Sequence, residues 1–264
     1  MIVRVLQWNI LFRESASRIL DVLKEVDADV LCLQELTSVS GHNEGIDVPA
    51  FLAEMLGFHS FYQISQEWDS PGDTHTIGNG ILSRYPLTNT RGVFVRPSQG
   101  MNPHDPALEG RAYVEVDVAL PDGTTLTVGT THLSYIPRGI MTPEKKHEID
   151  ALLDIAKTKE SRYVLTGDFN EQPESYTVQE LSRTLRHCGP SFETLTWPTR
   201  PFQSMAHEEP AMTAGHVVRE RRGWRIDYAF ATPDVTVIDA GIVETDVSDH
   251  LPILVELEIT PPER

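Results

Sequence analysis

The chain has 264 residues, of which 40% are hydrophobic and 23% are charged, as is usual for a soluble globular protein. This length suits one large domain or two small ones, and we expect a single domain over 1–264. The formal net charge of −17 disfavours strong nonspecific binding to nucleic acid, because that affinity comes largely from lysine and arginine on phosphates.

The two cysteines, Cys32 and Cys188, provide neither a disulfide framework nor a zinc site, and Cys32 lies in an apolar run typical of a core strand. A reducing, cytoplasmic location is therefore expected. No apolar run approaches the roughly 18 residues that span a bilayer, and the N-terminus has no basic head or cleavage site, so we predict no membrane span and no signal peptide.

The first predicted unit is a strand at 2–9, a helix and a strand at 29–34. Ile19, Leu20, Leu23 and Val26 form an apolar stripe at helical spacing, and they define the face of the helix expected to be buried.

A second helix is predicted over roughly 49–56, with Pro49 suited to its first turn and Gly57 to its end. Strands follow near 59–64 and 77–83.

Residues 111–119 alternate between apolar and polar side chains, which predicts a half-buried antiparallel strand with Tyr113 and Glu115 on its outer face. Asp122 and Gly123 then form a hairpin turn into a strand at 124–131.

A third helix is expected to begin after Thr142, with Pro143 at its first position. The remaining elements are a strand at 162–167, a helix near 175–186, strands near 225–231, 235–243 and 252–259, and two long loops at 97–110 and 198–223. Interspersed helices and strands, with several hairpins, predict sheets packed on each other with helices outside.

Polar side chains follow several of these strands. Asp168 and Asn170 come two residues apart at the end of an apolar run, so they point the same way from a strand end. Asn9, Glu35 and His132 also follow strand-like runs, and Asp249 and His250 precede the last run. Each group alone has an ordinary structural explanation, such as a turn or a helix cap. Together they indicate a catalytic site.

The carboxylates Glu35, Asp168 and Asp249, with the amides Asn9 and Asn170, are the hard oxygen ligands that magnesium prefers. His132 and His250 could divide acid and base work, because histidine titrates near neutral pH. A working histidine needs an orienting partner, and Asp227 is the candidate for His250.

These residues lie in motifs that resemble the endonuclease/exonuclease/phosphatase superfamily, which has the deoxyribonuclease-I-like fold. The motifs follow the expected order over almost the whole chain: Gln7-Trp8-Asn9, Leu33-Gln34-Glu35, Gly78-Asn79-Gly80-Ile81-Leu82-Ser83, Thr131-His132-Leu133, Gly167-Asp168-Phe169-Asn170, Arg225-Ile226-Asp227-Tyr228 and Ser248-Asp249-His250. The resemblance implies an α/β (α+β) four-layer sandwich, in which two mixed sheets pack face to face beneath outer helices. It also implies Mg2+-dependent hydrolysis of phosphate esters, with Mn2+ as a substitute.

The resemblance also implies roles. Glu35 is the main metal ligand with Asn9 beside it, and Asp249 completes the metal side. Asp168 and Asn170 position or activate the nucleophile and touch the metal or the phosphate. His250 contacts the scissile phosphate or acts as the base, and Asp227 orients it; whether Asp168 or His250 is the general base stays open.

Departures from the family's patterns concern the substrate. Abasic-site endonucleases typically carry an aspartate shortly after the first asparagine, where this chain has Ile10 and Leu11, and tyrosine where it has His132. A histidine at this position is more similar to the pattern of deoxyribonuclease I and the sphingomyelinases. Asn79 is the polar residue near the place where a partner of His132 is expected, and that partner stays open. Asn79 is also a candidate substrate contact. Arg111 could face a phosphate or be a solvated charge at the strand start.

Loop 198–223 carries Arg200, Arg219, Arg221 and Arg222 between Trp197 and Trp224. This arrangement favours either a basic, aromatic-flanked patch for a phosphate-bearing substrate or a solvated loop beside a core tryptophan.

We expect an enzyme that cleaves a phosphodiester. The partner is a phosphate-ester substrate: the net charge favours a small-molecule or lipid-headgroup phosphodiester, and the arginine-rich loop favours a nucleic acid in a nuclease or DNA-repair role. Phosphomonoesters are a further possibility. A catalytically silent binding module is the alternative from another class, and the oligomeric state stays open.

Overall fold

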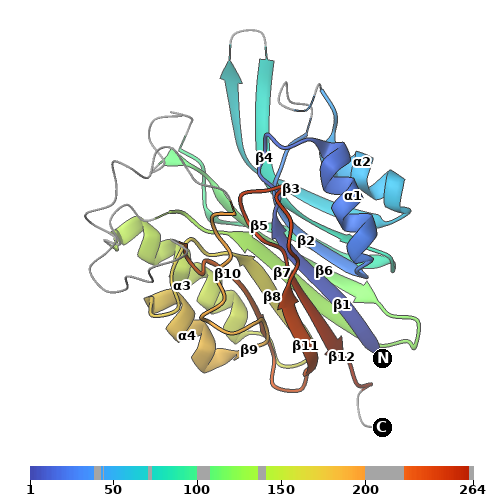
Figure 1. The fold of residues 1–264 in the computed structure, drawn as a ribbon. Helices are drawn as coiled ribbons and strands as arrows, with labels where there is room; N and C mark the ends of the chain where they lie inside the picture. Colours follow the sequence, from blue (N-terminus) through green and yellow to red (C-terminus); the bar gives the residue numbers. More distant parts are fainter. Residues whose placement is uncertain are drawn as a thin grey trace.

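Two six-stranded sheets form the centre of the molecule, and helices lie outside them (Figure 1). The computed structural model describes residues 1–38, 43, 45–70, 73–99, 108–135, 141–199 and 223–261. The first sheet has the order β11-β12-β1-β2-β4-β3, and the second has the order β5-β6-β7-β8-β10-β9.

The strands of the first sheet are β1 (Ile2–Asn9), β2 (Val30–Leu36), β3 (His59–Ser70), β4 (Asp73–Ser83), β11 (Thr236–Ile242) and β12 (Ile253–Glu258). Those of the second sheet are β5 (Leu87–Arg96), β6 (Arg111–Ala119), β7 (Thr125–His132), β8 (Tyr163–Asp168), β9 (Arg186–His187) and β10 (Asp227–Ala231). The helices are α1 (Ala16–Val26), α2 (Val48–Leu56), α3 (Pro143–Lys157) and α4 (Tyr176–Thr184).

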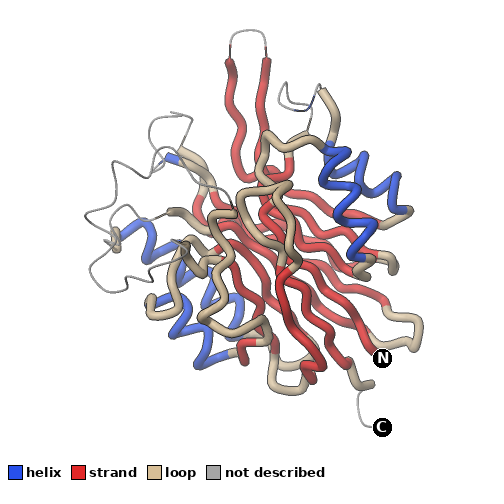
Figure 2. Tube along the Cα trace, in the orientation of Figure 1, coloured by secondary structure: helices blue, strands red, loops and turns tan. Residues whose placement is uncertain are grey.

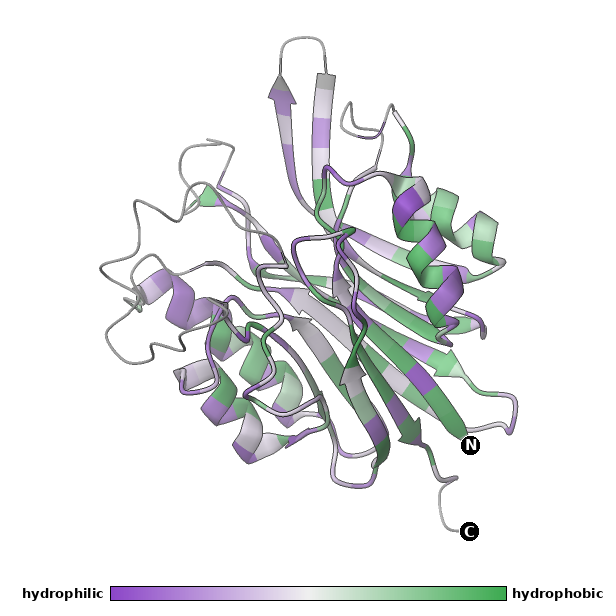
Figure 3. Cartoon of the chain, in the orientation of Figure 1, coloured by the Kyte–Doolittle hydropathy of each residue, from purple (hydrophilic) through white to green (hydrophobic). Residues whose placement is uncertain are grey.

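The apolar side chains form three clusters that match four layers. The central cluster joins the facing sides of the two sheets, with Val5 and Val30 from one and Val116 and Val128 from the other. A second cluster packs α1 and α2 on the outer side of the first sheet, and a third packs α3 on the outer side of the second (Figure 2). Figure 3 shows hydrophobic colour concentrated in the strands and in the sides of the helices toward them. The four-layer sandwich of two mixed sheets is confirmed.

The strand directions bring selected strand ends together. β1 and β2 are parallel neighbours in the first sheet, and β7 and β8 are parallel neighbours in the second. Since the carboxyl ends of parallel strands meet at one edge, Asn9 lies beside Gln34, and His132 lies beside Asp168. β10 runs antiparallel to β8, so Asp227 at its start pairs with Asp168.

Local sequence signals form the predicted helices. The predicted stripe of α1 is buried, Pro49 lies in the first turn of α2, and Gly57 ends that helix with φ 69°. Thr142 caps α3 by accepting a hydrogen bond from the backbone of Lys145. The predicted hairpin at Asp122 and Gly123 also forms.

Three features differ from the sequence predictions. β5 was not predicted; its side chains are mostly exposed and show no apolar alternation. β3 and β4 extend past the predicted ranges into a hairpin that projects from the sandwich and is coloured mostly hydrophilic or intermediate (Figure 3). The outer face of β6 was predicted to be solvated, but Tyr113 and Glu115 are buried because Tyr163 and Lys159 pack on them.

Among the described residues, no helix combines the length and apolar character that a membrane crossing requires.

Candidate active site

Asn9 joins carboxylates from the two sheets. Its amide nitrogen donates to Oε1 of Glu35, at 3.1 Å, and to Oδ2 of Asp168, at 3.0 Å. Its own Oδ1 accepts from the backbone nitrogen of Leu11, so the orientation of the amide is fixed. The structure therefore brings the predicted ligands Asn9, Glu35 and Asp168 to one place between the sheet edges.

Glu35 has an irregular backbone. Its φ is 59°, and the pairing of β2 with β4 shifts register between Leu33 and Leu36. A left-handed conformation costs a non-glycine residue energy and is often found at functional sites. Here it turns the carboxylate toward Asn9 and the backbone nitrogen of Phe12, which lies 3.0 Å from Oε2.

The electrostatics of Glu35 suit a cation. Burial raises the pKa of this carboxyl, and the charge of Asp249 acts in the same direction, against the hydrogen bonds from Phe12 and Asn9. A divalent cation beside Glu35 and Asp249 would neutralise both carboxylates. The carboxylate oxygens of Glu35 and Asp249 therefore fit a hard metal ion, and Asn9 lies beside them with its amide nitrogen on Glu35 and its oxygen on Leu11.

Asp168 and Asn170 form a tight turn after β8. Oδ1 of Asp168 accepts from the backbone nitrogen of Asn170 at 2.9 Å, and Asn170 has φ 53°, which asparagine tolerates. The side-chain amide of Asn170 donates to the carbonyl of Leu133 at 2.9 Å and contacts Nε2 of His132 at 3.1 Å. The turn thus binds the end of β8 to the end of β7.

The contacts of His132 define its proton state. Because the amide of Asn170 is oriented by Leu133, Nε2 of His132 accepts its hydrogen bond, and the ring proton lies on Nδ1. Burial lowers the pKa of His132 well below its usual value, and the positive charge of Arg111 acts in the same direction. His132 is therefore neutral at pH 7, and its Nε2 lies 3.4 Å from Oδ2 of Asp168.

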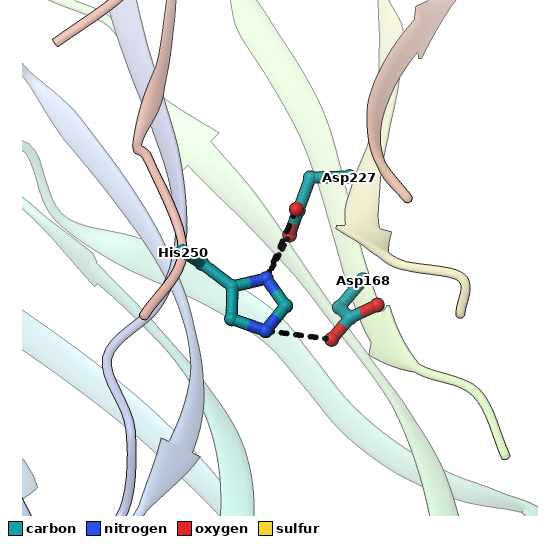
Figure 4. Close-up of side chains that lie close together, drawn as sticks. All are labelled: Asp168, Asp227 and His250. Carbon is teal, nitrogen blue, oxygen red and sulfur yellow. Dashed lines mark hydrogen bonds and ion pairs between the residues drawn. The ribbon is translucent and has the colours of Figure 1, made fainter. Parts of the chain in front are cut away.

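His250 lies between two carboxylates (Figure 4). Its Nδ1 is 3.0 Å from Oδ2 of Asp227, and its Nε2 is 3.7 Å from Oδ2 of Asp168. Burial alone would lower the pKa of His250, but Asp227 and Asp168 outweigh it and raise the pKa to about 10. The predicted pairing of His250 with Asp227 is present, and His250 carries a positive charge at neutral pH.

Asp168, Asp227 and His250 form a compact group of possible metal-ligating side chains, with ligand atoms within 4.8 Å of one another. In this group Nδ1 of His250 is already bonded to Asp227, at 3.0 Å, and Nε2 faces Asp168, at 3.7 Å. We therefore interpret this group as an ion-pair network and place the cation on the Glu35 side. Burial raises the pKa of Asp168, and His250 acts against that shift.

Asp249 is held by a tryptophan. Its Oδ2 accepts from the indole nitrogen of Trp197 at 3.0 Å, and the ring of Trp197 lies 6.1 Å from that of His250. Trp197 also lies against Trp224, with ring centroids 5.3 Å apart. The two tryptophans are therefore neighbours of the site. Arg200, Arg219, Arg221 and Arg222, between them in the sequence, lie outside the described residues.

Of the two predicted substrate contacts, Arg111 begins β6, and Asn79 lies in β4 and faces the start of β6. Asn79 is buried and donates to the carbonyl of Ala112 at 2.8 Å, and its Oδ1 is buried without a partner among the described residues. Arg111 forms an ion pair with Glu109, and its charge acts on His132. The roles of Asn79 and Arg111 in binding substrate remain predictions.

Two groups near the site were not singled out from the sequence. Gln7 donates to Oδ1 of Asp227 at 3.0 Å from within β1. Lys145 is buried beneath the strand ends, with Nζ 2.6 Å from the carbonyl of Ser134 and 3.4 Å from Glu171. The available signal for Gln7 was its polar side chain between the apolar Leu6 and Trp8, in the motif that ends at Asn9. Lys145 gave none, because lysine is ordinary in the first turn of a helix.

The chain is similar in sequence to one protein family. A sequence model of the "Endonuclease/Exonuclease/phosphatase family" matches residues 6–250. Comparison with curated proteins gave no match.

Several solved structures share the fold. An endonuclease/exonuclease/phosphatase from Beutenbergia cavernae is 24% identical, with a TM-score of 0.72, over 98% of this chain and 72% of that one. A mannosyl-6-phosphatase from Bacteroides thetaiotaomicron is 14% identical, with a TM-score of 0.64, over 97% of this chain and 100% of the other. The TDP2 of D. rerio, complexed with a single-strand DNA product, is 17% identical, with a TM-score of 0.61, over 98% and 99% of the two chains.

Proposed function

The chain belongs to the endonuclease/exonuclease/phosphatase family, whose members are metal-dependent hydrolases acting on phosphate esters, and we propose that this protein is a Mg2+-dependent phosphodiesterase. The observation that carries the proposal is the Asn9 amide, which holds Glu35 of one sheet and Asp168 of the other within hydrogen-bond distance. A site of this kind combines a metal ligand and a candidate base around one small volume.

The metal is assigned to Glu35, with Asp249 and Asn9 beside it. When bound there, Mg2+ supplies charge that stabilises the phosphoryl oxygens. Magnesium is preferred to zinc because the two ligands assigned to it, Glu35 and Asp249, are carboxylates.

Asp168 is the general base in this proposal. Burial raises its pKa, which makes the carboxylate a better proton acceptor, and the backbone of Asn170 fixes one of its oxygens. Oδ2 of Asp168 faces both His132 and His250 and can take a proton from a water molecule held there. The sequence left open whether Asp168 or His250 is the general base, and we propose Asp168.

His250 acts as a fixed positive charge. Because Asp227 raises its pKa, Nε2 keeps its proton at neutral pH and can donate to a phosphoryl oxygen. His132 is neutral and has a different role, because its ring holds Asn170 in place and fills the wall beside Asp168.

A small-molecule or lipid-headgroup phosphodiester is the preferred substrate, and the net charge of −17 supports this choice over a polynucleotide. The fold does not decide the matter, since both a mannosyl-6-phosphatase and a protein bound to single-strand DNA share it. A nuclease is therefore the second candidate, supported by the arginine-rich sequence between Trp197 and Trp224.

Turnover of bis-p-nitrophenyl phosphate tests the reaction. We expect hydrolysis that requires Mg2+, stops with EDTA and is lost in Asp168→Asn, while the exposed control Asp239→Asn retains full activity. Equal rates in Asp168→Asn and the wild type, without sensitivity to EDTA, would favour the silent binding module.

A panel of phosphate esters tests which class of substrate the protein cleaves. Sphingomyelin and inositol phosphates represent lipid-headgroup and small-molecule esters, and plasmid DNA and an abasic oligonucleotide represent nucleic acids. Cleavage of the nucleic acids alone would overturn the preference based on charge.

A further inference from the structure

A chain of buried amides and hydroxyls crosses from the first sheet to the second beneath the candidate active site. Gln7 of β1 donates to Gln34 of β2 at 2.8 Å and to Asp227 of β10 at 3.0 Å. Gln34 in turn donates to the hydroxyl of Thr130 in β7 at 2.8 Å. All four side chains are at most 1% exposed, so solvent cannot replace these bonds.

The partners dictate which way each amide points. Gln34 uses its nitrogen on Thr130 and on the carbonyl of Cys32, so its oxygen is left to accept. The carboxylate of Asp227 can only accept when it is ionised. Gln7 must therefore direct both of its N–H groups at acceptors, and its amide cannot be reversed without placing oxygen against oxygen.

This orientation leaves the carbonyl of Gln7 unsatisfied. Its Oε1 is buried without a hydrogen-bond partner in the described part of the chain. A buried unpaired carbonyl costs stability, and such a cost in a strand interior calls for a compensating role. The compensation on this side chain is the bond to Asp227, the carboxylate that orients His250.

We infer that Gln7 is a positioning residue for catalysis, which holds Oδ1 of Asp227 so that Oδ2 keeps the imidazole of His250 directed at Asp168. The inference rests on the proposed function and extends the site by one residue: Gln7, Asp227, His250 and Asp168 form a continuous series with successive contacts of 3.0, 3.0 and 3.7 Å. Without Gln7 the carboxylate can rotate about its bond to Cβ, and the ring of His250 can follow it.

Kinetics of Gln7→Met provide the first test. Methionine keeps the volume, removes the donor and also removes the unpaired carbonyl. With bis-p-nitrophenyl phosphate and Mg2+, we expect kcat to fall by about 10- to 100-fold, the scale of a hydrogen bond to a charged group. KM and the Mg2+ concentration for half-activation should stay within twofold, because Gln7 donates to Gln34 and Asp227 and not to Glu35 or Asp249.

A double-mutant cycle separates positioning from a general packing effect. Gln7→Met should lower kcat in the wild type but cause no further loss in an Asp227→Ala background. An equal loss in both backgrounds, or a wild-type kcat in Gln7→Met, would overturn the inference. Thr130→Val is the matched control: it breaks the same buried chain at its far end, leaves the bond between Gln7 and Asp227, and should keep kcat within threefold.

Two further measurements keep the test decisive if a variant is unstable or turnover is absent. Gln7→Glu retains the size, yet its single hydroxyl donor cannot serve both acceptors, and it should also lose kcat. Proton NMR of His250 needs no turnover: the Nδ1 proton, assigned by its absence in His250→Gln, should be protected in the wild type and in Thr130→Val and should exchange rapidly in Gln7→Met. A protected Nδ1 proton in Gln7→Met would refute positioning, whereas a wild-type protein inactive on every ester would refute only the proposed function.

Discussion

His250 and Asp227 reach each other from different sheets, with Nδ1 of the imidazole 3.0 Å from Oδ2 of the carboxylate. His250 lies three residues before the start of β12 in the first sheet, and Asp227 begins β10 of the second. Both side chains are buried, so their charges interact strongly. The charge state of the candidate site therefore depends on how the two sheets pack.

Asp227→Asn should change the pH dependence of the reaction. In the wild type His250 keeps its proton to about pH 10, because the carboxylates outweigh burial. Once Asp227 is neutral, burial lowers the pKa of His250, and the protonated form is lost at lower pH. We expect the alkaline limb of kcat/KM to move toward neutral pH by at least about one unit. An unmoved limb would show that His250 does not act as a cation.

Glu35→Gln should weaken metal activation. The neutral amide removes the main negative ligand while keeping the shape, so the Mg2+ concentration for half-activation should rise by about tenfold or more, the scale of a weakened metal site. Titration of activity with Mg2+, together with calorimetric binding of the metal, measures this. The exposed Glu244→Gln is the control and should match the wild type; equal metal affinity in both variants would place the metal elsewhere.

Replacement of either site histidine should lower kcat. His250→Ala removes the positive charge beside Asp168, and His132→Ala removes one of the two acceptors of the Asn170 amide, leaving the carbonyl of Leu133. The loss should be roughly 10²–10³-fold for His250→Ala, the scale of removing a group that stabilises charge in the transition state, and about 10- to 100-fold for His132→Ala, the scale of losing a supporting group. Steady-state kinetics should show no change for His59→Ala, which alters an exposed histidine at the start of β3. A full-rate His132→Ala enzyme would remove that residue from the mechanism.

His187→Gln should reduce the loss of stability in mild acid. Burial and the charge of Arg225 lower the pKa of His187 to about 4, whereas the unfolded chain has a value of about 6.5. Between these values the unfolded state binds more protons, so this group makes stability fall as the pH falls from about 6.5 toward about 4. Urea unfolding measures the free energy of unfolding at pH 7.5 and at pH 5. Its decrease between the two should be smaller in the variant than in the wild type, by on the order of 1 kcal/mol. His59→Gln alters an exposed histidine, and its free energy of unfolding should decrease as much as that of the wild type.

Elements with their own periodicity could be predicted from the sequence. α1 has its apolar stripe, α3 has its threonine cap and proline, and β6 and β7 have a hairpin turn of Asp122 and Gly123 between them. In each case the signal lies within about a dozen residues, so no tertiary contact is needed to read it.

Features set by tertiary packing could not be predicted. β5 is an edge strand whose side chains mostly face water, so its sequence has no apolar alternation. It forms because β6 offers a free edge. Glu115 alternates with apolar residues as a solvated side chain does, and it is buried because Lys159, beyond α3, packs against it.

The candidate site also could be predicted in part from local sequence and in part could not. Its side chains could be predicted from their positions at strand ends, because neighbouring parallel strands end at the same edge of a sheet. The sequence did not show which histidine is charged, because that depends on the distances of His132 and His250 from the carboxylates and from Arg111. The binding roles assigned to Asn79 and Arg111 stay predictions.

β12 lies between β11 and β1, and the amino group of Met1 donates to the carbonyl of Ile259. The strand that carries Asn9 thus receives one of its two neighbours from a segment more than 240 residues later, which also brings Asp249 and His250. During translation the other strands of both sheets can emerge from the ribosome while β1 still lacks this neighbour. The candidate site is consequently completed late in synthesis, and a nascent chain stalled before residue 249 would lack Asp249 and His250 however much of it had already folded.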